Sequence, residues 1–309
     1  MACHAILDLF VSTVNCVFVL CNVVCKPYNA ALNVTKEFVV MFFNASKVFT
    51  LCILFFPFFL HANALPKVEL GIGVGAQYLA DYRGADEYHA SGLPFPIFYY
   101  RGEKIKVDRS GVRGELLREK GWEINVSGEV ALNGGSDDNR AREGMPELDS
   151  AFELGPSLNI ALDGNIDDDG WMLRFPMRAV ITASSEGFDY IGYVFNPKLT
   201  YLVDRGPYDW RWSTSFGALW GSEKFHDYYY QIDQAFVRDD RPFYDASQGF
   251  SGVYFKSTLT KRTGNWHYGV SLRYDNLANA SFRDSALVKS DNYFSVSFLL
   301  ARYFWRSDD

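Results

Sequence analysis

The segment from Trp122 to Asn133 constrains the fold more than any other part of the chain. Apart from Gly128 and Ala131, its apolar side chains fall on one parity and its polar side chains on the other. Side chains of a β-strand alternate between two faces, so this pattern predicts a strand and not a helix. About a dozen residues at roughly 3.3 Å each reach on the order of 40 Å, which suits a tilted transmembrane strand. Ordinary globular strands are about half as long.

The same alternation recurs in 152–162, 171–182, 210–220 and 266–275. Each segment has one apolar, often aromatic, face and one polar face that includes charged residues. We therefore predict an all-β fold, an antiparallel transmembrane β-barrel with its apolar face toward lipid and its polar face inside. A soluble sandwich is the alternative, but it would bury the apolar face and use shorter strands.

The connections between these strands predict the number of strands. If the last strand, 292–305, runs toward the periplasm, short turns alternate with long outer segments, as they do in outer-membrane barrels. Two short strands within 104–117 then give a total of twelve, whereas one continuous strand over 95–109 gives ten. The short turns fall at 119–121, 165–170, 205–207 and 263–265, and the long segments at 133–149, 222–249 and 277–291.

Composition supports a membrane barrel. Aromatic residues make up 17% of the chain, and Tyr and Trp gather at strand ends, where membrane interfaces favour them. No stretch after residue 65 is long and apolar enough for a transmembrane helix. The net charge of -7 argues against a nucleic-acid partner, because binding phosphates needs a basic surface.

The N-terminal segment differs from the rest of the chain. All five cysteines lie within the first 52 residues, which indicates neither a disulfide framework nor a metal site in the remainder. Residues 48–60 form an apolar run followed by Ala62-x-Ala64, the pattern that signal peptidase cuts after. We expect a signal peptide over 41–64, with an uncleaved or buried helix as the alternative, and a barrel over 65–309. Residues 1–40 are then a start-site artefact, because Met41 begins a signal of normal length.

Several short motifs resemble the MipA/OmpV family of Gram-negative outer-membrane proteins. The resemblance covers essentially all of 65–309, and its motifs are structural, with no catalytic signature. The chain departs from barrels of this kind after Phe304 and Trp305, since four further residues follow that aromatic pair. The motifs are the glycine-alternating strand 68–78, the loop 81–88, Leu93-Pro94-Phe95-Pro96, Tyr100-Arg101-Gly102, and Glu153-Leu154-Gly155-Pro156-Ser157-Leu158.

The resemblance implies an outer-membrane location and a scaffold function. Some family members look like scaffolds that hold a lytic murein transglycosylase and a peptidoglycan synthase at the outer membrane. We expect the membrane lipid and these two enzymes as partners, no cofactor and no enzymatic activity. A small-solute pore or osmotically regulated channel is the alternative function.

Charged side chains on the inward parity are the candidate lumen residues. They could select small solutes across a pore, or they could pair and fill the interior, because a barrel of this size is small enough for side chains to close it. Their mixed signs favour the filled interior. The candidates are Glu123, Glu129, Glu153, Arg174, Arg178, Arg211, His267, Arg273 and Asp275.

Three further features allow more than one interpretation. Asp167-Asp168-Asp169 could hold a divalent cation, but the rest of a calcium-loop spacing is missing, so a solvated turn is favoured. The aromatic residues of 228–244 could form a binding surface, a plug or an interface girdle. His226, next to Asp227, could serve a hydrolase, although an ordinary loop histidine is the simpler interpretation.

Overall fold

The structure is a computed structural model that describes residues 66–108, 111–131, 136, 138–184, 187–206 and 208–307. The expected signal peptide, 41–64, and residues 1–40 lie outside this range. The described residues form a single 13-stranded sheet. Its strands are β1 (Val68–Ala80), β2 (Tyr88–Arg101), β3 (Ile105–Asp108), β4 (Gly111–Glu119), β5 (Trp122–Ala131), β6 (Ser150–Ala161), β7 (Gly170–Ser184), β8 (Gly187–Phe195), β9 (Lys198–Asp204), β10 (Trp210–Gly221), β11 (Gly249–Thr263), β12 (Trp266–Asn276) and β13 (Asn292–Arg306).

The sheet closes into an antiparallel barrel because β1 pairs with both β2 and β13. Strands β8 and β9 are two halves of one wall strand, interrupted at Asn196 and Pro197. Strand β7 pairs with β8 along one half of its length and with β9 along the other, and β10 pairs with both. The wall therefore has twelve strands, which confirms the predicted twelve. The two short strands expected within 104–117 are β3 and β4.

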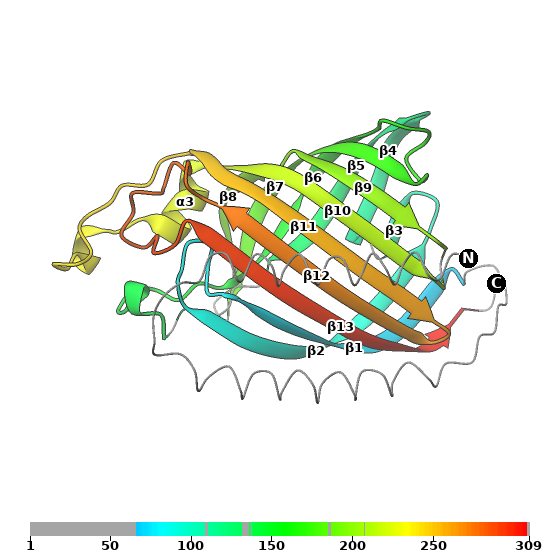
Figure 1. Cartoon of the computed structure of the whole chain (residues 1–309), viewed down its shortest axis with the longest axis horizontal. Coiled ribbons are helices and arrows are strands. Elements are labelled where there is room, and N and C mark those ends of the chain that lie inside the picture. The colour runs from blue at the N-terminus through cyan, green and yellow to red at the C-terminus, as the bar shows by residue number, and fades with distance from the viewer. Residues whose placement is uncertain are drawn as a thin grey trace, which may run out of the picture. The chain divides into compact units, whose positions relative to one another are not determined.

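The two ends of the barrel differ in the length of their connections (Figure 1). At one end, here called the turn end, strands are joined by the short segments 102–104, 120–121, 162–169, 205–209 and 264–265. The other end, here called the loop end, carries 81–87, the segment between β5 and β6, 222–248 and 277–291. The loop end also holds the short helices α3 (Glu223–Tyr230), η1 (Arg140–Arg142) and η2 (Gln234–Phe236).

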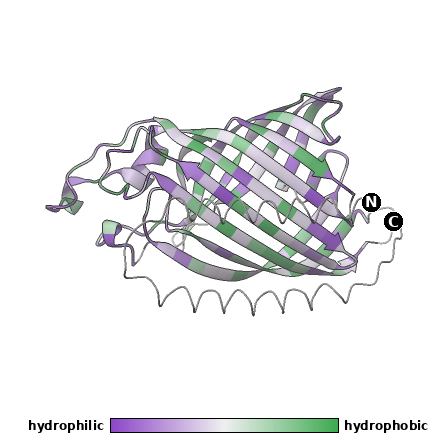
Figure 2. Ribbon diagram, in the orientation of Figure 1, coloured by the Kyte–Doolittle hydropathy of each residue, from purple (hydrophilic) through white to green (hydrophobic). Residues whose placement is uncertain are grey.

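Apolar side chains cover the outside of the barrel, and polar ones line its interior. Hydrophobic and hydrophilic residues alternate along the strands in Figure 2. Ile72, Phe216 and Phe298 are 58%, 60% and 56% exposed, whereas Glu123 and Asp275 are 6% and 0% exposed. Strands β7, β11 and β13 are each 15 residues long. This is the lipid-facing pattern expected from the sequence.

The glycines of β1 make room for side chains from neighbouring strands. A Cβ on Gly73 would lie 3.1 Å from Ile97 Cδ1 and 3.2 Å from Phe95 Cζ, and a Cβ on Gly75 would lie 3.3 Å from Phe95 Cε1. Phe95 and Ile97 of β2 therefore lie across the inner face of β1. The glycine-alternating pattern allows this close packing.

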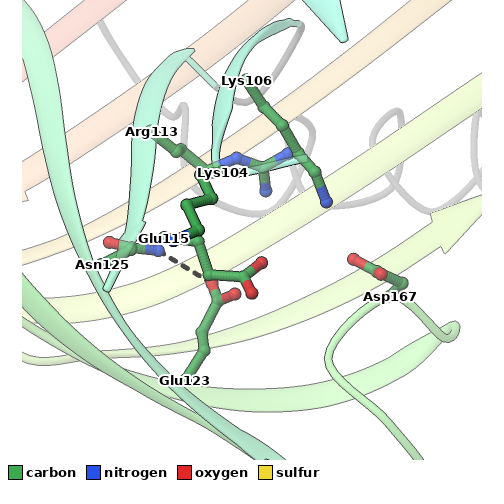
Figure 3. Close-up of a pocket in the computed structure, with 7 residues that line it drawn as sticks. All are labelled: Lys104, Lys106, Arg113, Glu115, Glu123, Asn125 and Asp167. Atoms are coloured by element: carbon green, nitrogen blue, oxygen red, sulfur yellow. Dashed lines mark hydrogen bonds between the residues drawn. The ribbon is translucent and has the colours of Figure 1, made fainter. Parts of the chain in front are cut away.

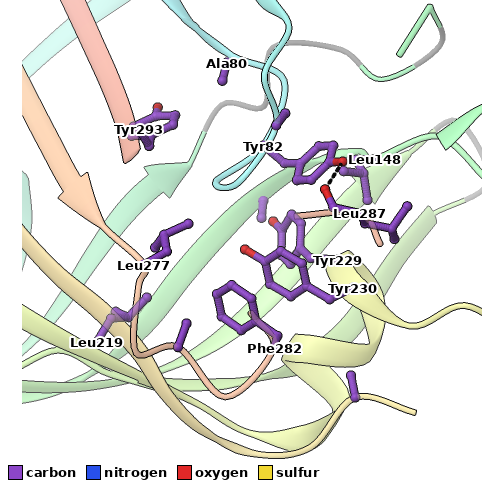
Figure 4. Close-up of a cluster of buried hydrophobic side chains, with 14 of the residues drawn as sticks. Ala80, Tyr82, Leu148, Leu219, Tyr229, Tyr230, Leu277, Phe282, Leu287 and Tyr293 are labelled. Carbon is purple, nitrogen blue, oxygen red and sulfur yellow. Dashed lines mark hydrogen bonds between the residues drawn. The ribbon is translucent and has the colours of Figure 1, made fainter. Parts of the chain in front are cut away.

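A buried aromatic cluster closes the loop end (Figure 4). The Tyr230 ring of α3 stacks on Phe282 with 3.6 Å between ring centroids, and the Tyr82 hydroxyl donates to the Leu287 carbonyl at 2.7 Å. Ser222 caps the N-terminus of α3 by accepting from Phe225 N. The interface-girdle interpretation is therefore wrong for Tyr229 and Tyr230, which are buried in this cluster. We call it the loop cap.

None of the helices among the described residues is long and apolar enough to cross a membrane.

Candidate functional site

At the turn end, the lumen is built around one buried carboxylate. Glu69 of β1 has no exposed surface and accepts hydrogen bonds from two arginines on other strands. Arg262 of β11 binds it through both terminal nitrogens, and Arg101 Nη2 of β2 donates at 2.7 Å. Arg306 Nε lies 3.2 Å from the same carboxylate. Several cations therefore share one anion, which ties four strands together through charge-assisted bonds.

In the middle of the lumen, charged side chains of opposite sign pair. Arg178 Nη1 of β7 donates to Glu129 Oε2 of β5 at 2.7 Å and to Glu153 Oε2 of β6 at 3.3 Å. Lys256 Nζ of β11 lies 3.7 Å from Glu129, so this contact spans the lumen from β11 to β5. Charges of opposite sign are therefore paired inside the barrel.

Below these pairs, Glu123 belongs to a polar network on β5 and β6. Asn125 Nδ2 and Asn159 Nδ2 donate to Glu123 Oε1 at 2.8 and 2.9 Å. Arg174 Nε donates to Met172 Sδ at 3.2 Å within β7. Further round the wall, between β9 and β10, Arg211 Nη1 donates to Asp204 Oδ2 at 3.1 Å.

Under the loop cap, Asp275 accepts from two arginines. Arg83 Nε from the β1–β2 loop donates at 2.9 Å, and Arg273 Nε of β12 donates at 2.7 Å. Arg83 Nη2 also donates to the Ser251 carbonyl at 2.7 Å, so one guanidinium ties the first loop to β11 and β12. Asp275 therefore fastens the loop cap to the wall.

The sequence-predicted lumen residues all lie on inward-facing positions, but they do not form one site. Glu129, Glu153 and Arg178 form one group, and Arg273 with Asp275 forms another. His267 lies in a third region, with Nδ1 at 3.2 Å from the Tyr303 hydroxyl. The sequence analysis missed three lumen residues, Glu69, Lys256 and Arg262. Their inward parity on β1 and β11 is a signal that could have found them. Their partners could not be predicted, because these lie far away from them in the sequence.

A small charged recess opens at the turn end (Figure 3). Its volume of about 10 Å³ suits on the order of one water molecule. Arg113 Nη2 donates to Asp108 at 2.5 Å, and Arg118 Nη2 lies 2.9 Å from Asp167. The lining balances three basic against three acidic side chains, Lys104, Lys106, Arg113, Glu115, Glu123 and Asp167, together with Asn125.

The aspartates of 167–169 stabilise the turn between β6 and β7 through hydrogen bonds and an ion pair. Asp168 Oδ2 accepts from Asn165 N at 2.8 Å, and Asp169 Oδ1 accepts from Asp204 N at 2.6 Å. Together with the ion pair between Asp167 and Arg118, these contacts give each carboxylate a structural partner. Within the described residues, no group of three or more His, Cys, Asp or Glu side chains is arranged to hold a metal ion.

His226 lies inside the loop cap with no exposed surface. Its Nε2 lies 2.7 Å from Ser251 Oγ, and its Nδ1 lies 2.6 Å from the Ser247 carbonyl, so Nδ1 is the protonated nitrogen that donates. Desolvation lowers the pKa of His226, the nearby charge of Arg83 lowers it further, and the bond to Ser247 opposes both. The histidine thus joins α3 to β11 in its neutral form.

The long tilted strands, the apolar outer face and the polar interior define an outer-membrane-type β-barrel. The model of the family described as MltA-interacting protein MipA matches residues 72–304, so the chain belongs to the MipA family. The resemblance noted in the sequence is thereby confirmed.

Two solved structures of Pseudomonas proteins are similar to this chain at low identity. A COG4313 outer membrane channel from Pseudomonas putida F1 has 13% identity and a TM-score of 0.39, over 81% of this chain and 99% of that one. OccK2 (OpdF) from Pseudomonas aeruginosa has 8% identity and a TM-score of 0.21, over 78% of this chain and 98% of that one. No curated protein matches the chain.

Proposed function

We propose that this barrel is a non-catalytic anchor in the outer membrane of a Gram-negative cell, docking peptidoglycan-remodelling enzymes at its turn end. The observation that carries the proposal is how the lumen charges are used. Arg178, Glu129 and Glu153 pair inside the barrel, and the loop cap closes over Asp275. A barrel filled in this way is suited to rigidity more than to flux.

The turn end supplies the docking surface in this proposal. Its turns expose charged side chains of both signs, including Glu103, Lys104, Lys120 and Arg205. In the proposed orientation the turn end faces the periplasm, where murein enzymes work. The family is named for an interaction with MltA, and the resemblance implies a lytic murein transglycosylase and a peptidoglycan synthase as partners.

The test is binding of purified lytic transglycosylase and peptidoglycan synthase to the barrel in lipid nanodiscs. Neutralising the turn end with Lys104→Ser, Lys120→Ser and Arg205→Ser should weaken binding several-fold, mainly through slower association. Neutralising the loop end with Arg238→Ser and Arg283→Ser is the matched control and should leave binding unchanged. Equal loss with both sets, or no binding by the unmodified barrel, would contradict docking at the turn end.

A small-solute pore is the second candidate, favoured by the charges that line the interior. If solutes pass, they pass the group formed by Arg178, Glu129 and Glu153, so ion selectivity should depend on Arg178. Conductance in planar bilayers separates this function from the anchor.

A further inference from the structure

The barrel wall is incompletely paired on one side. Strand β1 pairs with β2 along the whole of β2 up to Tyr100, but β3 pairs with β2 only at Tyr100 and Arg101. Within the part of the chain that the structure describes, no strand pairs with the edge of β2 from Tyr88 to Phe98 on the side facing away from β1. The described pairs of the β3–β4 hairpin end at Asp108 and Gly111.

The other side of this gap is β5, which pairs with β4 no further than Gly128. On the loop-end side of the gap, two hydrogen bonds form a tie between the β1–β2 loop and the segment between β5 and β6. Asn139 Nδ2 donates to Asp81 Oδ2 at 2.7 Å, and Arg140 Nε donates to Glu87 Oε1 at 2.8 Å. The unpaired region is thus bounded by β2, β5, the β3–β4 hairpin and this tie. We call it the β2–β5 window.

Two prolines keep the β2 edge of the window from pairing. Arg101 N donates to the Lys67 carbonyl at 2.8 Å, which places the amides of odd-numbered β2 residues toward β1. Even-numbered residues point toward the window because backbone groups alternate along a strand. Pro94 and Pro96 are both even-numbered and have no N–H, so this edge is a poor template for another strand.

The window lies at the depth of the lipid hydrocarbon. Tyr78 stacks on Tyr88 near the loop end with 5.4 Å between ring centroids, and Phe98 stacks on Tyr100 near the turn end at 6.4 Å. Aromatic residues mark the two interfaces of such barrels, and the unpaired edge runs between these pairs. Backbone groups left bare in hydrocarbon cost several kcal/mol each, so the carbonyls of this edge require donors from water or a ligand.

The inner surface beside the window is apolar, unlike the charged lumen elsewhere. Leu93 has the same inward parity as Phe95 and Ile97 and is 55% exposed. Phe95 packs with Ile97, Tyr99, Leu299, Ala301 and Tyr303 in a separate apolar cluster. A molecule at the window would meet apolar side chains inside the wall and, at its edge, the β2 carbonyls that point away from β1.

We propose that the β2–β5 window is a lateral access site that takes one acyl chain of a bilayer phospholipid. The chain lies against Leu93 and Phe95, and the glycerol end of the lipid, with its bound water, supplies donors to the carbonyls of Pro94 and Pro96. A lipid fits this position better than a strand of a partner, because the prolines remove two of the donors that strand pairing would use. The inference does not depend on the docking function proposed above.

The experiment uses the whole chain with its five cysteines changed to serine, reconstituted in phosphatidylcholine vesicles. A fluorophore is attached at Leu93→Cys and, in separate variants, at Ser271→Cys and Phe298→Cys. Ser271 faces inward on the fully paired strand β12, and Phe298 faces outward and is 56% exposed. Quenching by phosphatidylcholine with dibrominated acyl chains is then compared among the three sites.

We expect the Leu93 label to be quenched several-fold more than the Ser271 label and nearly as much as the Phe298 label. Quenching no greater than at Ser271 would overturn the proposal. Ser91→Cys, on the same inward face of β2, replaces Leu93→Cys if that variant does not fold. A dimer of the unmodified chain with crosslinks through β2 would also overturn it, since the edge would then be an interface between copies.

Discussion

Individual buried charges contribute strongly to the stability of the barrel against unfolding. Glu69 is the clearest case, because its carboxylate neutralises Arg262 and Arg101 inside the wall. The sequence places Glu69 on the inward face of β1 together with the glycines. Its partners come from strands far away in the chain, so sequence reasoning could predict its direction but not its role.

Glu69→Gln should destabilise the barrel by about 3–5 kcal/mol, because it leaves buried guanidinium groups without an anion. Urea unfolding of the barrel refolded in lipid vesicles measures this change. Arg238→Ala is the control, since the exposed pair between Arg238 and Glu143 contributes only about 0–1 kcal/mol. Similar losses for the two variants would show that the Glu69 network is not a main source of stability.

The loop cap should loosen in acid through His226. Its pKa lies below the ordinary value of 6.5, so the folded cap binds fewer protons than the unfolded one, and the stability of the cap falls as the pH drops below about 6.5. Arg142, whose Nη1 donates to the Tyr229 carbonyl, is 4% exposed, so trypsin cleavage after Arg142 reports opening. Cleavage should accelerate from about pH 8 to about pH 5 relative to His226→Gln at each pH. Parallel rates for both proteins would contradict this role.

Among the strand elements, β6 and β7 approach unusually closely. The Gly155-Pro156 step of β6 lies opposite Met177 and Arg178 of β7, and the paired residues skip this point. A Cβ on Gly155 would come within 2.1 Å of the Met177 carbonyl oxygen. This contact gives a physical meaning to the glycine and proline of the 153–158 motif, which the sequence alone showed only as a resemblance.

Gly155→Ala should therefore destabilise the barrel by about 1–3 kcal/mol, as overpacking does. Gly114→Ala on β4 is the matched control, because a Cβ there meets nothing within 4 Å. That control should stay within about 0.5 kcal/mol of the unmodified barrel. Urea midpoints in vesicles give both values, and equal midpoints for the two variants would show that the strands move apart without cost.

Restoring two backbone N–H donors should let the edge of β2 pair with a strand of another chain. Pro94→Val with Pro96→Val adds N–H groups to the unpaired edge, and open edges with donors promote pairing between chains. We expect a dimer or larger species in analytical ultracentrifugation of the detergent-solubilised variant. Pro146→Val in the segment between β5 and β6 is the control and should leave the barrel monomeric. A monomeric double variant would mean that the prolines do not protect this edge.

For the whole molecule, the sequence predicts the strand architecture much better than it predicts which side chains pair in the interior. A period of two, read along strands such as 122–131 and 266–276, is set by each strand alone, so the facing of each strand followed directly. The strand number followed as twelve, with ten as the alternative. The pairing of Arg178 with Glu129 and Glu153 depends on the register between three strands, which periodicity does not contain. For the same reason, the loop cap could be predicted only as one of three interpretations of the 228–244 aromatic residues, because its members come from four separate connections.

The paired charges across the lumen predict a poorly conducting barrel. Single-channel currents in planar bilayers should be small for the unmodified chain. Arg178→Ala should raise conductance several-fold and shift selectivity toward cations, because it removes a positive group from the charged pairs inside the lumen. Arg283→Ala at the loop end is the control and should leave currents unchanged. Large currents from the unmodified chain would favour the pore over the anchor.

The seam between β1 and β13 has a consequence for biogenesis. Val68 N donates to Ser307 Oγ, and these residues are 239 positions apart in the chain. Bringing such distant residues together is entropically costly and slow, so closing the cylinder is the late step of assembly. Until then, the nascent sheet presents two unsatisfied edges, one on β1 and one on the strand most recently added. We therefore expect assembly to need a chaperone that shields both edges until β13 pairs with β1.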